Sequence, residues 1–208
     1  MTLPTKYYQM TSTVTKDAQL RMELVQNDFP KPKPHEVVIR VEASPINPSD
    51  QGVMFGWSNM ANAYHKGEGL ERVLIAPISD QGMGIMKARI GQNLPVGNEG
   101  AGTVVLTGDS EEAKALMGKK VAALSGSMYA EYCCVPAMTC LPLFDENSCK
   151  DGASSFVNPL TALSMVETMK LEGHKSLVHT AAASNLGQML NKVCIADGVE
   201  LVNIVRRE

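Results

Sequence analysis

The sequence has little excess charge of either sign and no long apolar run. Its net charge is -3 over 208 residues, whereas general nucleic-acid binders usually carry a basic surplus. No stretch approaches the roughly 20 apolar residues that span a bilayer. The amino-terminal segment MTLPTKYYQMTSTVTKD also lacks the apolar core of a secretory signal. We therefore expect a cytoplasmic protein with no nucleic-acid partner and no membrane segment.

The cysteines lack the spacing of a metal site or a disulfide framework. There are five, and no two of them form a C-x-x-C pair, so reduced thiols are the simplest interpretation. Cys133 and Cys134 are adjacent in a strand-like run, where neighbouring side chains point to opposite faces. We expect no metal ligand among the cysteines, which are Cys133, Cys134, Cys140, Cys149 and Cys194.

Residues 1–155 have the pattern of a small β domain. Short segments rich in β-branched residues are separated by glycine and proline, which is typical of a barrel built from short strands. A proline-rich stretch, FPKPKPH, precedes the first of these segments. The predicted strands are 36–46, 101–108, 119–126 and 129–136.

Residues 52–91 interrupt this pattern with a stretch rich in glycine, methionine and asparagine. A long irregular insertion in a compact domain is often a lid or binding loop. The alternative is a helix or hairpin that only covers one end of the barrel. The sequence leaves both open.

The pattern changes to alternating helices and strands after Cys149. We predict a helix over 160–171, begun by Pro159, then a strand at 176–180, a helix at 185–196 and a strand at 199–205. Gly198 ends the second helix. Strand, helix and strand form a βαβ unit with parallel strands and a right-handed crossover. The fold class is therefore α/β with a β-rich first part.

Residues 156–208 contain only two strands of a sheet that normally has about five or six. Both edges of such a sheet would be open, and one helix cannot cover both faces. We therefore expect an incomplete Rossmann-type domain, in a chain that is the first part of a longer polypeptide. A partner chain that completes the sheet, or a degenerate gene product, would also account for the two strands.

The turn TAAASNLGQ, residues 180–188, resembles the dinucleotide-binding turn G-x-G-x-x-G. The pattern is Ala181-x-x-Ser184-x-x-Gly187, so only the last glycine is kept. Small residues still allow close approach of a pyrophosphate to the backbone N–H groups that begin the helix. A plain turn between a strand and a helix would look the same.

Arg206 and Arg207 follow the turn by about 20 residues, where the fold places the residue that reads the ribose. An acidic residue there would bind the ribose hydroxyls of NAD, whereas arginine suits a 2′-phosphate. The pair therefore favours NADPH as cofactor. A solvated charge cluster at a strand end is the alternative.

Several segments together resemble the medium-chain dehydrogenase/reductases. They cover nearly the whole chain except 52–91. This family joins a GroES-like β domain to a Rossmann domain, with the active site in the cleft between them, and its members are longer than this chain. The segments are EASPINPSD, PVGNEGAGTVV, GSMYAEYCCVP, VNPLTAL and LVHTAAASNLGQ, in this order.

The resemblance also bears on zinc. Zinc-dependent members carry a cysteine in the segment that matches PINPSD and a histidine in the segment that matches GNEG. This chain has Asn47 and Asn98 there, and a neutral amide is a poor zinc ligand. The cysteine cluster of the structural zinc is missing too. The chain thus resembles the zinc-independent branch, so we expect NADPH and no zinc.

Within that branch the chain is similar to quinone oxidoreductases and to mitochondrial-type trans-2-enoyl-thioester reductases. The resemblance implies hydride transfer from NADPH to an electron-poor carbon of a quinone, enal or enoyl thioester. Asn47 would lie near the nicotinamide. A tyrosine before GNEG, for which Tyr64 is the candidate, would donate the proton, although an exposed loop tyrosine is the alternative. Tyr129 and Tyr132 are interpreted as packing residues. The implied cofactor contacts are Asn158, Thr161, Ala183, Ser184, Asn185, Leu186, Gly187, Arg206, Arg207 and Glu208.

A second hypothesis is a non-catalytic protein that uses the GroES-like domain as a binding or structural module and keeps a vestigial nucleotide site. The eroded glycines and the two-stranded sheet favour it, whereas the arginine pair and the order of the motifs favour the enzyme. For the enzyme we expect a small-molecule substrate and a homodimer in a longer form, and weak or absent turnover by these 208 residues alone. The resemblance leaves the mitochondrion as an alternative location.

Overall fold

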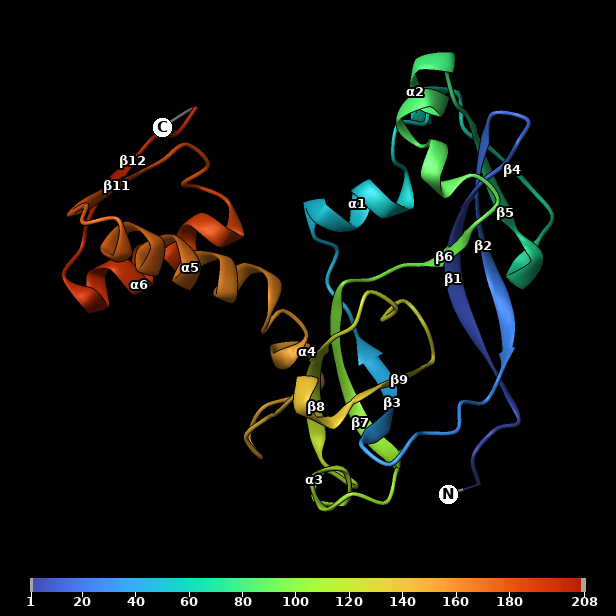
Figure 1. Ribbon diagram of the computed structural model, residues 1–208, viewed down its shortest axis with the longest axis horizontal. Coiled ribbons are helices and arrows are strands. Elements are labelled where there is room, and N and C mark those ends of the chain that lie inside the picture. Colours follow the sequence, from blue (N-terminus) through green and yellow to red (C-terminus); the bar gives the residue numbers. More distant parts are fainter. Residues whose placement is uncertain (1, 207–208) are drawn as a thin grey trace. The chain divides into compact units, whose positions relative to one another are not determined.

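The computed structural model describes residues 2–206. They divide into two compact units, with the boundary between Ala153 and Ser154. The first unit contains two five-stranded sheets and the second a two-stranded parallel sheet with two helices (Figure 1). This confirms the predicted fold class, a GroES-like β unit followed by a βαβ unit of Rossmann type. The assignment of 1–155 and 156–208 as catalytic and NADP-binding domains stays a prediction.

The first sheet is formed largely by the chain's amino-terminal hairpin. Strands β1 and β2 pair antiparallel from Lys6↔Asp28 to Val14↔Leu20. Alternation along the strands turns every second side chain inward, so Val14, Leu20 and Met22 are buried in one apolar core. The strands, in sheet order, are β4 (Tyr64–Lys66), β5 (Val73–Pro77), β2 (Gln19–Asp28), β1 (Lys6–Val14) and β6 (Asn93–Pro95).

Insertion 52–91 is built into the first sheet. Its strand β5 pairs with β2, and β4 pairs with β5. Ile78 and Met86 are buried in the core of this sheet. The structure therefore favours a covering role for most of the insertion over a detached lid. Its short helices are α1 (Pro48–Met54, which begins before the insertion), η1 (Met60–Asn62), η2 (Gly69–Glu71), α2 (Asp80–Ile85) and η3 (Lys87–Arg89).

The second sheet contains the four strands that the sequence predicted for this unit. Their apolar side chains form a separate core with Val37, Ile39, Val104 and Val121 at its centre. A short helix, α3 (Glu111–Lys114), connects β7 to β8, and 3-10 helix η4 (Ala137–Thr139) connects β9 to β10. The strands, in sheet order, are β10 (Cys140–Pro142), β8 (Lys120–Leu124), β7 (Glu99–Thr107), β3 (Glu36–Ala43) and β9 (Tyr132–Pro136).

The second unit has the predicted order of strand, helix and strand. Strands β11 (Ser176–His179) and β12 (Glu200–Asn203) pair in parallel, in register Ser176↔Glu200. Helix α5 (Val157–Leu171) packs against α6 (Asn185–Asp197), and Ala162, Val166, Leu190 and Cys194 are buried between elements of this unit. Helix α4 (Cys149–Gly152) ends the first unit.

One predicted helix end differs in detail, and another agrees. Helix α5 begins at Val157 rather than after Pro159. Proline is tolerated there because residues in the first turn need no N–H for the helix ladder. Gly198 follows α6 with φ 66°, and its N–H bonds to the last turn, as predicted. Within residues 2–206 no helix combines the length and the apolar character needed to cross a membrane.

Candidate functional site

The turn between β11 and α6 is shaped by Ser184 and Gly187. Ser184 is the N-cap of α6, and its side-chain oxygen accepts a 3.1 Å hydrogen bond from the N–H of Gly187. The N–H groups in the first turn of a helix have no partner inside it. Because Ser184 satisfies that of Gly187, the N–H groups of Asn185 and Leu186 remain for an anion at the positive end of the helix.

Gly187 fits this turn because it has no side chain. A Cβ atom there would lie 2.7 Å from the carbonyl oxygen of Ala181 and closer still to that of Ala182. The spacing of the dinucleotide fingerprint puts its first glycine two residues before Ser184, at Ala182 rather than at Ala181. Ala182 is buried. The turn therefore keeps the tight backbone approach of the fingerprint with alanine and serine in place of two glycines.

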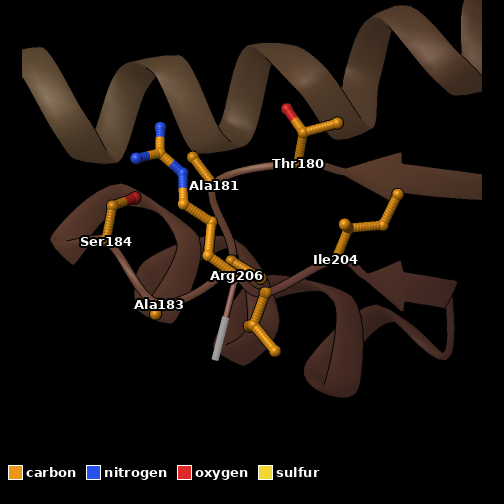
Figure 2. Close-up of a pocket in the computed structure, with 8 residues that line it drawn as sticks. Thr180, Ala181, Ala183, Ser184, Ile204 and Arg206 are labelled. Carbon is orange, nitrogen blue, oxygen red and sulfur yellow. The ribbon is translucent and has the colours of Figure 1, made fainter. Parts of the chain in front are cut away.

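Arg206 lies across a cavity of about 490 Å³ from this turn. Figure 2 shows its side chain extending toward Ala181 and Ser184, with Ile204 on the strand side. A hydrogen bond of 2.9 Å from the N–H of Ile204 to the carbonyl of His179 continues the parallel ladder beyond β12. The end of β12 is thus fixed beside the turn, and Arg206 brings a cation to the space in front of the first turn of α6.

The predicted cofactor residues are only partly brought together. Ala183, Ser184 and Arg206 line the cavity, and Asn185, Leu186 and Gly187 form the first turn of α6. Arg207 and Glu208 fall outside the described residues. Sequence reasoning missed Ile204 and Val205, which also line the cavity. Their position follows from strand register, which no local motif reports.

Two other predicted cofactor residues belong to α5. Asn158 lies in its first turn. The Thr161 hydroxyl donates a 2.6 Å hydrogen bond to the carbonyl of Val157 one turn earlier, and Thr161 lines a different cavity, of about 370 Å³, beside β11. Neither residue lines the Ala181–Arg206 cavity. Their cofactor role stays a prediction that the resemblance alone supports.

In the first unit, Asn47 and Glu99 form a buried pair. The side-chain amide of Asn47 donates a 2.8 Å hydrogen bond to the Glu99 carboxylate, and both residues are almost fully buried. Asn47 is the N-cap of α1, and Glu99 begins β7. The sequence named Asn47 but not Glu99, although Glu99 follows Asn98 directly in the GNEG segment.

Asn47 and Asn98, which match the zinc ligands of zinc-dependent medium-chain dehydrogenase/reductases in the resemblance above, both donate hydrogen bonds through their side-chain amides. Asn98 donates to the Ser49 hydroxyl at 2.9 Å, as Asn47 donates to Glu99. An amide nitrogen that donates has no lone pair for a metal. Residues 2–206 also contain no group of three His, Cys, Asp or Glu side chains that could hold a metal ion. The absence of zinc stays a prediction.

Tyr64, the candidate proton donor, is on the edge strand β4. It is about 43% exposed, and the Lys66 ammonium lies 5.8 Å from its ring centre. Figure 1 shows β4 at the outer edge of the first sheet, away from the start of α1, where Asn47 lies. Within the first unit, Tyr64 and Asn47 are therefore not neighbours, and Tyr64 is exposed on a strand rather than in a loop. Its role as proton donor stays a prediction.

Tyr129 is held against the Asn47 segment. Its hydroxyl donates a 2.8 Å hydrogen bond to the carbonyl of Pro45. Burial, together with the carboxylates of Asp50 and Glu99, raises its pKa above the ordinary value, so it stays a neutral donor. This agrees with the interpretation of Tyr129 as a packing residue.

A GroES-like β unit followed by a βαβ unit with a dinucleotide-type turn is the architecture of medium-chain dehydrogenase/reductases. No sequence-family model matches the chain. Among solved structures it is similar to a candidate NADPH:quinone reductase from Mesorhizobium loti, with 30% identity and a TM-score of 0.70, over 100% of this chain and 57% of that one.

Two further neighbours show the same fold at lower identity. The quinone oxidoreductase of Pseudomonas syringae pv. tomato has 19% identity and a TM-score of 0.66, over 97% of this chain and 53% of that one. The quinone oxidoreductase of Thermus thermophilus, also solved in complex with NADPH, has 22% identity and a TM-score of 0.62, over 94% of this chain and 52% of that one.

The predicted resemblance to the quinone-oxidoreductase branch of the medium-chain dehydrogenase/reductases is thereby confirmed. The chain spans a little more than half the length of these relatives.

Proposed function

We propose that the chain binds NADPH at the Ala181–Arg206 cavity and is part of an NADPH-dependent oxidoreductase that uses no zinc. The observation that carries the proposal is the meeting of two anion-binding features in one cavity, the Ser184-capped start of α6 and the Arg206 guanidinium. Neighbours that are NADPH:quinone oxidoreductases support it.

The residues fit the cofactor in two places. The N–H groups of Asn185 and Leu186 would bind the pyrophosphate, since Gly187 allows the backbone to approach. Arg206 would hold the 2′-phosphate through a charge-assisted, forked contact. When bound, NADPH supplies a hydride. Selectivity for the phosphorylated cofactor would thus depend on Arg206, and general affinity on the turn.

For the acceptor we propose a quinone, an enal or an enoyl thioester, whose conjugated carbonyl withdraws electrons from the carbon that receives hydride. The chain would contribute Asn47, oriented by Glu99, as a neutral hydrogen-bond donor near the reacting carbonyl. Tyr64 stays the candidate proton donor of this proposal, and retained activity in Tyr64→Phe would remove it. A small-molecule substrate and a homodimer are proposed with the enzyme.

Binding of 2′,5′-ADP and 5′-AMP to the 208-residue chain tests the cofactor site by calorimetry. We expect 2′,5′-ADP to bind at least about tenfold tighter than 5′-AMP, because one charge-assisted phosphate contact contributes about 1.5–3 kcal/mol. Arg206→Ala should remove most of this difference and leave 5′-AMP affinity nearly unchanged. Lys175→Ala, which removes an exposed cation from the same unit, is the matched control.

If neither nucleotide binds in this titration, the proposed cofactor site is wrong. That result would favour the non-catalytic hypothesis, in which the β unit is the functional part. If the two nucleotides instead bind with equal affinity, and Arg206→Ala changes neither affinity, the result would argue for a cofactor without the 2′-phosphate, such as NADH, rather than NADPH.

A further inference from the structure

The apolar face of the first sheet is fully buried at one end and only partly covered at the other. Along β1, the inward side chains run from Val14 to Met10 and Tyr8, opposite Leu20, Leu24 and Gln26 of β2. At the Val14 end they are fully buried, whereas Met10, Tyr8 and Leu24 are only half-buried. The apolar layer therefore stops short of the end of the hairpin.

A cavity of about 480 Å³ lies at this end, which we call the barrel mouth. Tyr8, Met10 and Leu24 line it from the first sheet, and Val41 of β3 and Tyr129 line it from the other side. Leu70 of η2, which is about half exposed, contributes one wall. Its size and apolar lining are those of small-molecule sites, which often lie at the mouths of β-barrels.

The floor of the barrel mouth is held in place by backbone hydrogen bonds. The segment 129–131 connects β1 to β3, because the N–H of Met10 donates to the carbonyl of Tyr129 and the N–H of Val41 donates to that of Glu131, at 2.8 and 3.0 Å. The Glu131 carboxylate accepts a 2.8 Å hydrogen bond from the N–H of Tyr8. These hydrogen bonds fix the backbone at the floor of the cavity, and the exposed Glu131 side chain is held there by the N–H of Tyr8.

The charge at the barrel mouth has one sign. Glu131 lines the cavity, and Glu23 and Glu71 line an adjoining hollow of about 270 Å³ that shares Tyr8, Leu24 and Leu70 with it. Glu23 is paired with Arg21 at 3.4 Å, but among the described residues no lysine, arginine or histidine lines either cavity. Two tyrosines, Tyr8 and Tyr129, also line the cavity, and aromatic rings attract cations.

We propose that the barrel mouth binds a small organic cation, an ammonium ion carried on an aromatic or short aliphatic group. The apolar part packs on Met10 and Leu24, and the ammonium faces Glu131 and the tyrosine rings. This site lies within the first unit and is separate from the Ala181–Arg206 cavity in the second. It does not depend on the proposed oxidoreductase function.

Calorimetric titration of the full 208-residue chain with 2-phenylethylammonium tests the proposal at low salt, with 2-phenylethanol as a neutral probe of similar shape. We expect the cation to bind at about millimolar concentration and the alcohol about fivefold more weakly, since a partly exposed ion pair contributes up to about 1 kcal/mol. The anion 3-phenylpropionate should not bind. Added salt should weaken the binding of the cation and leave the binding of the alcohol unchanged.

Two variants locate the binding. Glu131→Gln keeps an acceptor for the N–H of Tyr8 but removes the charge. It should therefore lower the affinity for the cation about fivefold and leave the affinity for the alcohol unchanged. Glu111→Gln, on exposed α3, should change neither. The proposal is overturned if no probe binds at about 10 mM, if cation and alcohol bind equally, or if Glu131→Gln folds and binds the cation as the parent chain does.

Discussion

The Oδ1 atom of Asp50 accepts a 2.8 Å hydrogen bond from the backbone N–H of Asn98, 48 residues further along the chain. Its other oxygen accepts a 2.7 Å bond from the N–H of Asn47. One buried carboxylate thus holds together the two segments whose counterparts in zinc-dependent relatives carry the metal ligands. The Asp50 carboxylate fixes the backbone of Asn47 and Asn98 relative to each other.

Replacing Asp50 by asparagine should destabilise the first unit. The amide retains one acceptor oxygen but brings an NH₂ group toward a buried N–H, so one donor loses its partner. We expect a loss of about 2–3 kcal/mol in the free energy of unfolding, measured by urea denaturation. Asp80→Asn, at an exposed position in the first turn of α2, should cost less than about 1 kcal/mol. Equal stability of the two variants would contradict the bridging role of Asp50.

Gly187→Ala should damage the turn before α6. The added methyl group meets two carbonyl oxygens within 3 Å, so the backbone must shift, and nucleotide binding should fall by at least about tenfold. The control is Gly84→Ala in α2, where a Cβ meets no neighbouring atom within 4 Å. That change should leave binding intact and stabilise the chain by up to about 1 kcal/mol. Unimpaired binding by Gly187→Ala would show that the turn does not hold the nucleotide.

The cysteines should resist alkylation in the folded chain. Burial raises the pKa of the Cys134 thiol to about 12 and that of Cys140 also to about 12, and only the thiolate reacts. We expect slow labelling of both by iodoacetamide at about pH 8, followed by mass spectrometry, and rapid labelling of all five cysteines in denaturant. Fast modification of Cys134 or Cys140 in the native chain would contradict the raised pKa that their partial burial produces.

The stabilising effect of Glu42 should disappear in acid. A 2.7 Å hydrogen bond from the Thr103 hydroxyl, and then Arg40, lower the pKa of this carboxyl below its ordinary value. A lowered folded-state pKa contributes stability above the unfolded pKa, and this contribution is lost as the pH falls through the folded pKa. Glu42→Gln should therefore lower the free energy of unfolding by about 0.5–1 kcal/mol at neutral pH.

Below the folded pKa of Glu42 the parent and Glu42→Gln should converge, which denaturation at a series of pH values measures. Thr103→Val should reduce the same pH dependence, because it removes the hydroxyl that donates to the carboxylate. A difference between the parent and Glu42→Gln that persists unchanged into acid would mean that ionisation of Glu42 is not its source.

The sequence by itself determined the elements whose signals are local. Four strands of the second sheet, the βαβ order of the second unit and the stop at Gly198 follow from β-branched runs, helix periodicity and a glycine in a left-handed conformation. The small residues of the 180–188 turn likewise predicted a tight turn between strand and helix. These features depend on residues close in the chain, so a linear pattern can report them.

Only the tertiary structure decided which distant residues meet. The pairing of β5 with β2 made insertion 52–91 part of the first sheet, and strand register brought Ile204 and Val205 to the cavity of Arg206. The Asn47–Glu99 pair, separation of Tyr64 from Asn47 and the hollow at the barrel mouth also arise from chain segments tens of residues apart. Such contacts depend on sheet register and on the filling of an interior, which are properties of the whole packed chain.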